Sequence, residues 1–220
     1  MNWNQLLPML WQGTVDTVYM TVWASLIAYL IGLPLGVLLV ITQRGHILPR
    51  PALHTALGIA VNFLRSIPFI IMLALLFPVT RAVMGSAIGT RSVIFPLVIS
   101  AFPYIARMVE GSLAEVDAGV IEAAQSMGST NMQIIFKVLL PEAVPSLVNG
   151  AAISVTTILA YTALASAAGG GGLGALAIVK GLNIRKFDIM YSASLLLVAL
   201  VQIITVLGTR LTRSLDHKRR

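Results

Sequence analysis

Long apolar runs without a charged side chain constrain this chain more than any other feature. One extends from Thr17 to Gln43, and a later one fills the thirty-seven residues between Glu142 and Lys180. A helix of about 20 apolar residues is enough to span the hydrocarbon core of a bilayer. Only 10% of the 220 residues are charged, whereas soluble domains carry about 25%. The sequence therefore predicts an all-α integral membrane protein with the lipid bilayer as its surroundings.

Five transmembrane helices can be placed in a single membrane domain that covers residues 1–220. Glycine and proline inside a run are tolerated, because neighbouring helices satisfy the backbone groups that they free. The glycine quartet Gly169–Gly172 divides the longest run into a span and an outer loop. The expected spans cover about residues 18–43, 56–79, 92–110, 143–168 and 189–209.

The distribution of positive charge sets the expected orientation. With the C-terminus inside, ten of the fifteen Lys and Arg residues lie on the inner side and five on the outer side. An excess of Lys and Arg marks the cytoplasmic side of a membrane protein. The N-terminus is therefore expected outside, the C-terminus inside, and the loop 111–142 between the third and fourth spans in the cytoplasm.

Composition and motifs argue against several other classes of function. The net charge of +7 does not indicate a nucleic-acid partner, because five cations follow the last apolar run with no aromatic residue among them. The chain has no cysteine and three scattered histidines, so no metal site is expected. The glycine quartet lacks the Gly-Lys-Ser/Thr ending of a phosphate loop. We therefore expect no catalytic residue, no metal and no cofactor bound by this chain.

The inner loop contains two helix signals around one glycine. Asp117 can cap a first helix that ends near Met127, with Gly128 as its left-handed C-terminal residue. The segment Thr130–Gln133 has the spacing of a capping box that opens a second helix, and Pro141 is expected to end it. A compact protrusion and an amphipathic pair on the membrane surface both fit these signals.

Polar residues mark two places within the spans. In the second span, Arg65, Ser66 and Phe69 fall on one helical face, and Pro68 is expected to kink the helix there. Arg65 can face protein or water, or reach the headgroups from near the cytoplasmic end. In the fourth span, Tyr161 belongs to a stripe of small and hydroxyl-bearing residues, which suits either helix packing or a pathway lining.

Three elements of the inner loop resemble the EAA loop of bacterial ABC importer permeases. They are Glu122-Ala123-Ala124, then Gly128, and then Val138-x-Leu140-Pro141 after nine residues. Most of the remaining chain is similar to the methionine importer permeases. That similarity rests on the segments Asn62–Ile70 and Pro103–Glu110, the glycine-rich run Gly169–Gly174, the five spans and the length.

The resemblance implies a permease subunit of an ATP-driven importer in the bacterial inner (cytoplasmic) membrane, for D- or L-methionine. It implies a homodimer, two ATP-binding cassette subunits that bind ATP and Mg, and an extracytoplasmic substrate-binding protein or lipoprotein. The implied ATPase-coupling residues are Glu122, Ala123, Ala124, Met127, Gly128, Leu140 and Pro141. The implied candidates for the translocation path or gate are Arg65, Ser66, Pro68, Phe69, Tyr161, Thr162 and Leu164.

Two alternatives remain open from the sequence. The first is a permease of the same class for another amino acid or a small polar solute. The second is an ion-coupled secondary transporter, which would normally show inverted repeats and acidic residues within the membrane. The span interiors lack Asp and Glu, which favours the ATP-driven class.

Overall fold

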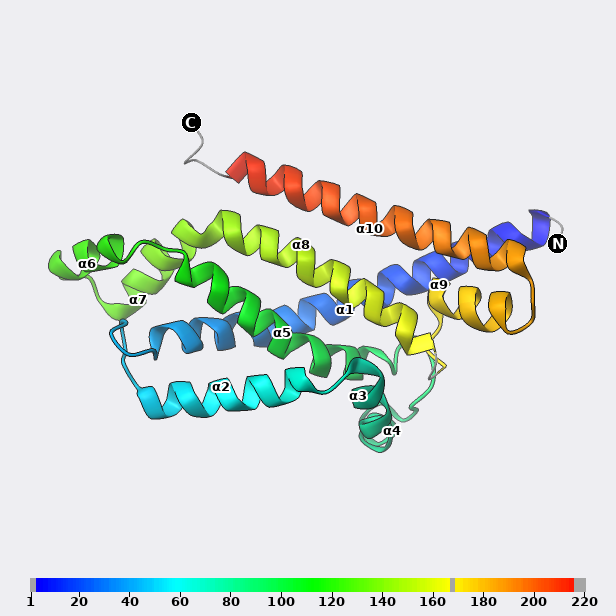
Figure 1. Cartoon of the computed structure of the whole chain (residues 1–220), viewed down its shortest axis with the longest axis horizontal. Coiled ribbons are helices and arrows are strands. Elements are labelled where there is room, and N and C mark those ends of the chain that lie inside the picture. Colours follow the sequence, from blue (N-terminus) through cyan, green and yellow to red (C-terminus); the bar gives the residue numbers. More distant parts are fainter. Residues whose placement is uncertain (1–2, 167–168, 216–220) are drawn as a thin grey trace. The chain divides into compact units, whose positions relative to one another are not determined.

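A computed structural model (Figure 1) describes residues 3–166 and 169–215, and every regular element within these ranges is helical. The first half contains α1 (Trp3–Ile41), α2 (Pro51–Ser66), α3 (Phe69–Leu75), α4 (Phe77–Met84) and α5 (Ile94–Ala114). The second half contains α6 (Ala118–Ser126), α7 (Asn131–Ile134), the π-helix η1 (Ile135–Leu139), α8 (Leu140–Ala165), α9 (Gly172–Ala175), the π-helix η3 (Leu176–Leu182) and α10 (Phe187–Leu215).

Four helical stretches among the described residues are long and apolar enough to cross a membrane. A fifth crossing results if α2 and α3 are counted together, although they are bent by 97°. This confirms an all-helical chain with four to five candidate membrane helices. The four long stretches are Gln5–Ile41, Ile94–Ala114, Asn131–Ala165 and Phe187–Leu215.

The second span is not the continuous helix expected over residues 56–79. Helix α2 ends at Ser66, and Pro68 precedes α3 with extended torsions, φ −56° and ψ 140°. Proline has no N–H to continue the ladder and disfavours helical torsions in the residue before it, here Ile67. The sequence correctly predicted that Pro68 interrupts the helix. The interruption is larger than the expected kink, because α2 ends and α3 starts in a new direction.

Pro141 does not end a helix, contrary to the expectation. Helical structure runs from Asn131 through Ala165, so the fourth membrane helix begins inside the expected loop 111–142. A π-helical stretch directly precedes the proline, and there the Leu140 N–H donates to the carbonyl of Ile135, five residues back. Because of this wider turn, the helix continues through Pro141 although proline has no N–H to donate. The last two residues of the expected span 143–168 lie outside the described part of the chain.

The described residues form two compact units. Unit 1 comprises Met1–Ala28, Ile67–Ala101 and Val155–Thr205, and unit 2 comprises Tyr29–Ser66, Phe102–Ser154 and Val206–Arg220, each as far as it is described. The core of unit 1 lies where the start of α1, α9 with η3 and the start of α10 meet. Its buried members are Leu6, Leu10, Leu173, Leu176, Ala177, Ile189 and Ala193. In unit 2, Leu39, Val61 and Ala106 join α1, α2 and α5.

Helices α1 and α5 approach each other closely within unit 2. A Cβ atom built on Gly36 would lie 2.6 Å from the carbonyl oxygen of Ala106 and 2.6 Å from Cβ of Val109. One built on Gly32 would lie 2.8 Å from the carbonyl oxygen of Phe102. Small residues at such positions let membrane helices pack backbone against backbone.

Replacing Gly36 by leucine is therefore expected to destabilise the fold. Forcing a side chain into a packed contact costs about 1–3 kcal/mol, so the unfolding temperature should fall. The intrinsic fluorescence of the three tryptophans reports this temperature for the purified protein in detergent.

The matched control is Gly111→Leu. Gly111 also lies in a helix, but no atom lies within 4 Å of a Cβ built there. An equal loss of stability in both variants would show that the close approach of α1 and α5 is not the cause.

Candidate coupling surface and gate

The two short helices of the inner loop begin with side-chain caps. The Oδ1 atom of Asp117 accepts a hydrogen bond from the N–H of Gly119 at 2.7 Å, at the start of α6. At the start of α7, the N–H of Thr130 donates to Oε1 of Gln133 at 2.8 Å, and the N–H of Gln133 donates to Oγ1 of Thr130 at 3.4 Å. Both caps confirm the prediction, and the second is a complete capping box.

Gly128 forms the turn between these helices. Its φ of +76° lies in the left-handed region, which glycine adopts without a steric penalty. Its N–H donates to the carbonyl of Gln125 at 2.9 Å, and the N–H of Ser129 donates to the carbonyl of Ala124 at 3.1 Å. These two bonds make a Schellman motif. The predicted left-handed residue after α6 is confirmed.

Helix α6 packs on α7 and η1, beside which it lies in Figure 1. Ile121 and Ala124 of α6 are buried, Ala124 to 3% exposure, and Ile134 of α7 and Leu139 of η1 are fully buried. Met127 is 80% exposed and does not share their side of the helix. Ala124 thus contacts its own chain, so that any coupling role it has would act through the placement of α6.

Several side chains of this helical pair are exposed, large apolar ones among them. We define as the coupling surface the exposed residues Val120, Glu122, Ala123, Met127, Met132 and Phe136 of α6, its C-terminal end, α7 and η1. Leu140 is half-buried and Pro141 is exposed at the start of α8. Exposed apolar side chains gathered on one surface commonly mark a protein or membrane contact.

Sequence reasoning missed Val120, Met132 and Phe136. A signal was available for the last two, since they are four residues apart in a helix and enclose the apolar pair Ile134 and Ile135. Residues at that spacing share one face. The sequence could therefore have placed Met132 and Phe136 on one face and Ile134 and Ile135 on another. It could not have shown which of the two faces is exposed.

Carboxylates dominate the charge around the coupling surface. The segment from Glu110 to Glu142 contains Glu115, Asp117 and Glu122 besides its two ends, with Lys137 as its one cation. Glu110 is engaged by Arg107, whose NH1 lies 2.6 Å from Oε2, as the spacing predicted. The other four carboxylates are exposed. The surface therefore suits a partner with an apolar groove and basic groups at its edge.

Arg107 has a second contact that joins two helices. Its NH2 group donates to the carbonyl of Gly58 at 3.1 Å, which connects α5 to α2 within unit 2. The guanidinium therefore bridges the carboxylate of Glu110 and the backbone of another helix. Both contacts help to hold α5 in place, which is a structural role.

Two gate candidates from distant parts of the sequence meet in unit 1. The rings of Phe69 and Tyr161 are stacked, with centroids 4.7 Å apart and planes 1° apart. Phe69 is the first residue of α3, and its side chain is buried. Because this ring follows the break at Pro68 directly, the stack fixes the start of α3 against α8.

The other gate candidates differ in burial and in the contacts that they make. Thr162 is buried, and its hydroxyl donates to the carbonyl of Leu159 at 2.6 Å within α8. Leu164 is exposed. Arg65 and Ser66 are exposed residues of unit 2, and the Ser66 hydroxyl donates to the carbonyl of Asn62 at 2.8 Å.

The glycine quartet is packed against α1. The N–H of Leu173 donates to Oγ1 of Thr17 at 2.9 Å. A Cβ atom built on Gly171 would lie 2.6 Å from Oγ1 of Thr90, and one built on Gly172 would lie 2.6 Å from Oγ1 of Thr17. The quartet leads directly into a short helix, because α9 begins at Gly172.

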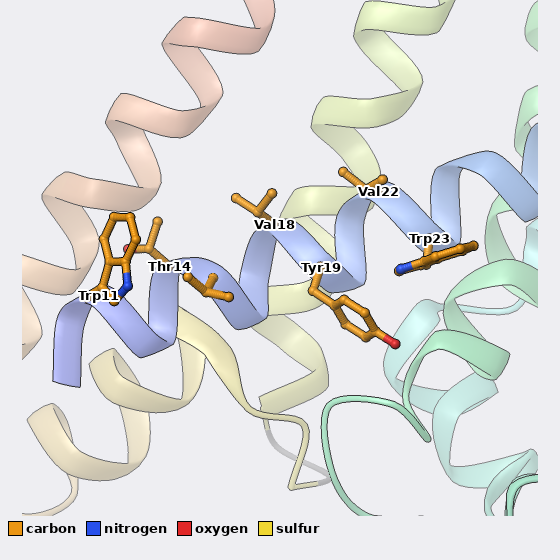
Figure 2. Close-up of a pocket in the computed structure, with 7 residues that line it drawn as sticks. Trp11, Thr14, Val18, Tyr19, Val22 and Trp23 are labelled. Atoms are coloured by element: carbon orange, nitrogen blue, oxygen red, sulfur yellow. The ribbon is translucent and has the colours of Figure 1, made fainter. Parts of the chain in front are cut away.

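An apolar groove of about 430 Å³ follows a single face of α1 and is lined by Trp11, Tyr19 and Trp23 among others, as Figure 2 shows. Tyr19 and Trp23 lie edge to face, with ring centroids 6.4 Å apart. No group of three potential metal ligands occurs in the described part of the chain. The apolar lining of this groove suits contact with lipid.

Comparison with known proteins is consistent with this geometry. Residues 32–220 match the family described as binding-protein-dependent transport system inner membrane component. A probable D-methionine transport system permease protein of Vibrio cholerae is 43% identical over 218 residues, which cover 99% of this chain and 95% of that protein. The D-methionine transport system permease protein of Escherichia coli K12 is 46% identical over 160 residues, 71% of this chain and 74% of its own length.

A solved structure is similar over nearly the whole chain. It comes from the MetNI methionine ABC transporter in inward-facing conformations, with a TM-score of 0.96 and 41% identity over 99% of this chain and 100% of that chain. A chain of an amino acid ABC transporter crystallised with histidines has a TM-score of 0.72 at 20% identity, over 100% of this chain and 99% of its own, which shows a shared fold alone. This chain therefore belongs to the family of binding-protein-dependent transport system inner membrane components.

Proposed function

We propose that this chain is the transmembrane permease subunit of an ATP-driven importer of methionine. The observation that carries the proposal is its likeness, along almost its full length, to a chain of the methionine transporter described above. The relatives from Vibrio cholerae and Escherichia coli described above are also named as D-methionine transport system permeases. Because the chain belongs to a family of binding-protein-dependent transport systems, we favour the ATP-driven importer over the ion-coupled secondary transporter.

The proposed orientation places the N-terminus outside and the C-terminus inside. Arg210 and Arg213 lie at the C-terminal end of α10, and Arg44 and Arg50 lie between α1 and α2. An excess of cations marks the cytoplasmic side. In this orientation α6 and α7 project into the cytoplasm, where ATPase subunits would be found.

The coupling surface is proposed to dock into a groove of the ATPase. It offers Met127, Met132 and Phe136 as exposed apolar contacts, with Glu122 beside them. Flexible methionine side chains adapt well to such a contact. The capping box and the Schellman motif make the helical pair rigid, so that a displacement by the ATPase would pass to α8 without being absorbed in the loop.

The pore is proposed to be a symmetric dimer of this chain. One copy with four to five membrane helices surrounds only part of a path, and closed two-fold dimers are the commonest oligomers. Two ATPase subunits would bind the two coupling surfaces, and a substrate-binding protein would deliver methionine from outside. ATP binding would favour the outward-open state and hydrolysis the inward-open state, through different affinities of the ATPases for the two pore states.

The test is uptake of labelled methionine into proteoliposomes that contain this chain, its ATPase and its substrate-binding protein. We expect D- or L-methionine to accumulate in the lumen. This accumulation should require ATP in the lumen, where the ATPase subunits of inward-transporting complexes lie, and the substrate-binding protein in the external solution. Labelled histidine under the same conditions is the control for another amino acid. Preferred uptake of histidine, or methionine uptake driven by an ion gradient without ATP, would contradict the proposal.

A further inference from the structure

The turn between η3 and α10 combines cations with exposed apolar side chains. We name it the η3–α10 tip. It consists of Lys180, Leu182, Ile184, Arg185, Lys186 and Phe187. The three apolar side chains are 53%, 59% and 49% exposed, in chain order, and the three cations are exposed as well. Among the described residues, none of these cations forms an ion pair.

Backbone hydrogen bonds stabilise the η3–α10 tip. The N–H of Asn183 donates to the carbonyl of Ile178 at 2.9 Å, and the N–H of Lys186 donates to the carbonyl of Gly181 at 2.8 Å. Arg185 adopts a φ of 58°, which is uncommon for a residue with a side chain. These backbone hydrogen bonds stabilise the turn that exposes the apolar side chains of the tip.

The position of the tip matches the headgroup layer of a bilayer. Phe187 is the first residue of α10, which is long and apolar enough to cross a membrane. Residues at such a helix end lie at the level of the lipid phosphates. A separate apolar groove of about 900 Å³ lies farther along α10 in the same unit, beginning at Ser192, and is lined by Leu195, Leu196 and Ala199 together with Leu7 and Trp11 of α1.

We propose that the η3–α10 tip is a binding site for an anionic phospholipid. Its cations would bind the lipid phosphate, its apolar side chains would enter the upper acyl region, and the groove would hold an acyl chain. The nearby carboxylate of Asp188 accepts a hydrogen bond from the N–H of Ile189 at 3.0 Å, which directs this charge toward the start of α10. The inference needs only that α10 spans the membrane, and the proposed function adds that the lipid belongs to the outer leaflet.

A lipid fits the tip better than a protein partner does. The centres of protein interfaces are depleted in lysine and join their apolar side chains into one patch. In the tip, Arg185 and Lys186 separate Ile184 from Phe187, and Lys180 precedes Leu182 by two residues. Alternation of basic and large apolar side chains is typical of segments that lie in the membrane interface.

The absence of native cysteine permits a direct test with single labels. The full chain with Ile184→Cys carries a bimane label and is placed in nanodiscs of phosphatidylglycerol or of phosphatidylcholine. We expect a blue-shifted emission that brominated phosphatidylglycerol quenches. Ser126→Cys on the exposed side of α6 is the matched control, and its label should remain in water. A water-like label at residue 184 in both lipids would overturn the proposal, as would a shift that occurs only after the substrate-binding protein is added.

A second measurement tests the cations. Native mass spectrometry compares retention of phosphatidylglycerol and phosphatidylcholine by the wild type and by a variant with Lys180→Gln, Arg185→Gln and Lys186→Gln. Each cation near an anionic surface contributes about fivefold, so the variant should lose roughly a hundredfold of the preference. Lys137→Gln, in the inner loop, should lose none. An unchanged preference in the triple variant would overturn the proposal. Neither measurement involves ATP or methionine, so its outcome is independent of the import assay.

Discussion

Replacing Gly128 by proline is expected to abolish co-purification of the ATPase with this chain while membrane insertion stays intact. Proline fixes φ near −65°, whereas Gly128 has a φ of +76° and donates its N–H to the carbonyl of Gln125. The substitution removes the Schellman motif and re-aims α6. No atom lies within 4 Å of a Cβ built at this position, so the effect is on the turn and not on packing in the bundle. The ATPase retained by a tagged permease measures the outcome.

Two further variants separate conformation from side-chain identity. Gly128→Asn should retain most of the ATPase, because asparagine tolerates the left-handed region better than other residues with a side chain. Glu122→Lys leaves the turn intact but reverses an exposed charge on the coupling surface, and it should also abolish retention. Normal complexes with both Gly128→Pro and Glu122→Lys would contradict the coupling role of this loop.

The parts of the fold and site that the sequence predicted depend on local interactions. The Asp117 cap, the Thr130–Gln133 capping box and the Gly128 turn involve groups at most five residues apart. Such hydrogen bonds are determined by residue type and spacing alone. The apolar runs are equally local, since the length of an uncharged segment decides whether it can span a bilayer. These features were therefore readable without a structure.

The features that the sequence did not predict depend on distant contacts or on competing local geometries. The stacking of Phe69 on Tyr161 and the burial of Ala124 need the packed helices. Pro68 permits either a kink or a break in the helix. In this structure the helix breaks, and the stacking of Phe69 on Tyr161 joins the following helix α3 to α8. At a proline such as Pro141 a helix can either end or continue through a wider turn. Here the helix continues, through the π-helical stretch that begins at Ile135.

The second large effect is expected at Phe69. Phe69→Ala removes a buried ring, and substitutions of this kind cost about 3–5 kcal/mol. For a chain of this length that corresponds to a fall in unfolding temperature of roughly 6–20 °C, measured by tryptophan fluorescence. Phe77→Ala is the matched control, because Phe77 also begins a short helix but is exposed. Equal shifts for the two variants would show that the stack on Tyr161 does not hold α3.

Stability and transport together separate the two roles that the Phe69–Tyr161 stack can have. Phe69→Leu keeps an apolar side chain of similar size, so it should cost less than about 1.5 kcal/mol, yet it removes the stacked ring. If the stack closes the path, proteoliposomes with Phe69→Leu should leak labelled methionine without ATP, while those with Phe77→Leu should not. If leakage is absent while Phe69→Ala still lowers the unfolding temperature, the stack is a packing contact that fixes α3 on α8, and the gate lies elsewhere in the dimer.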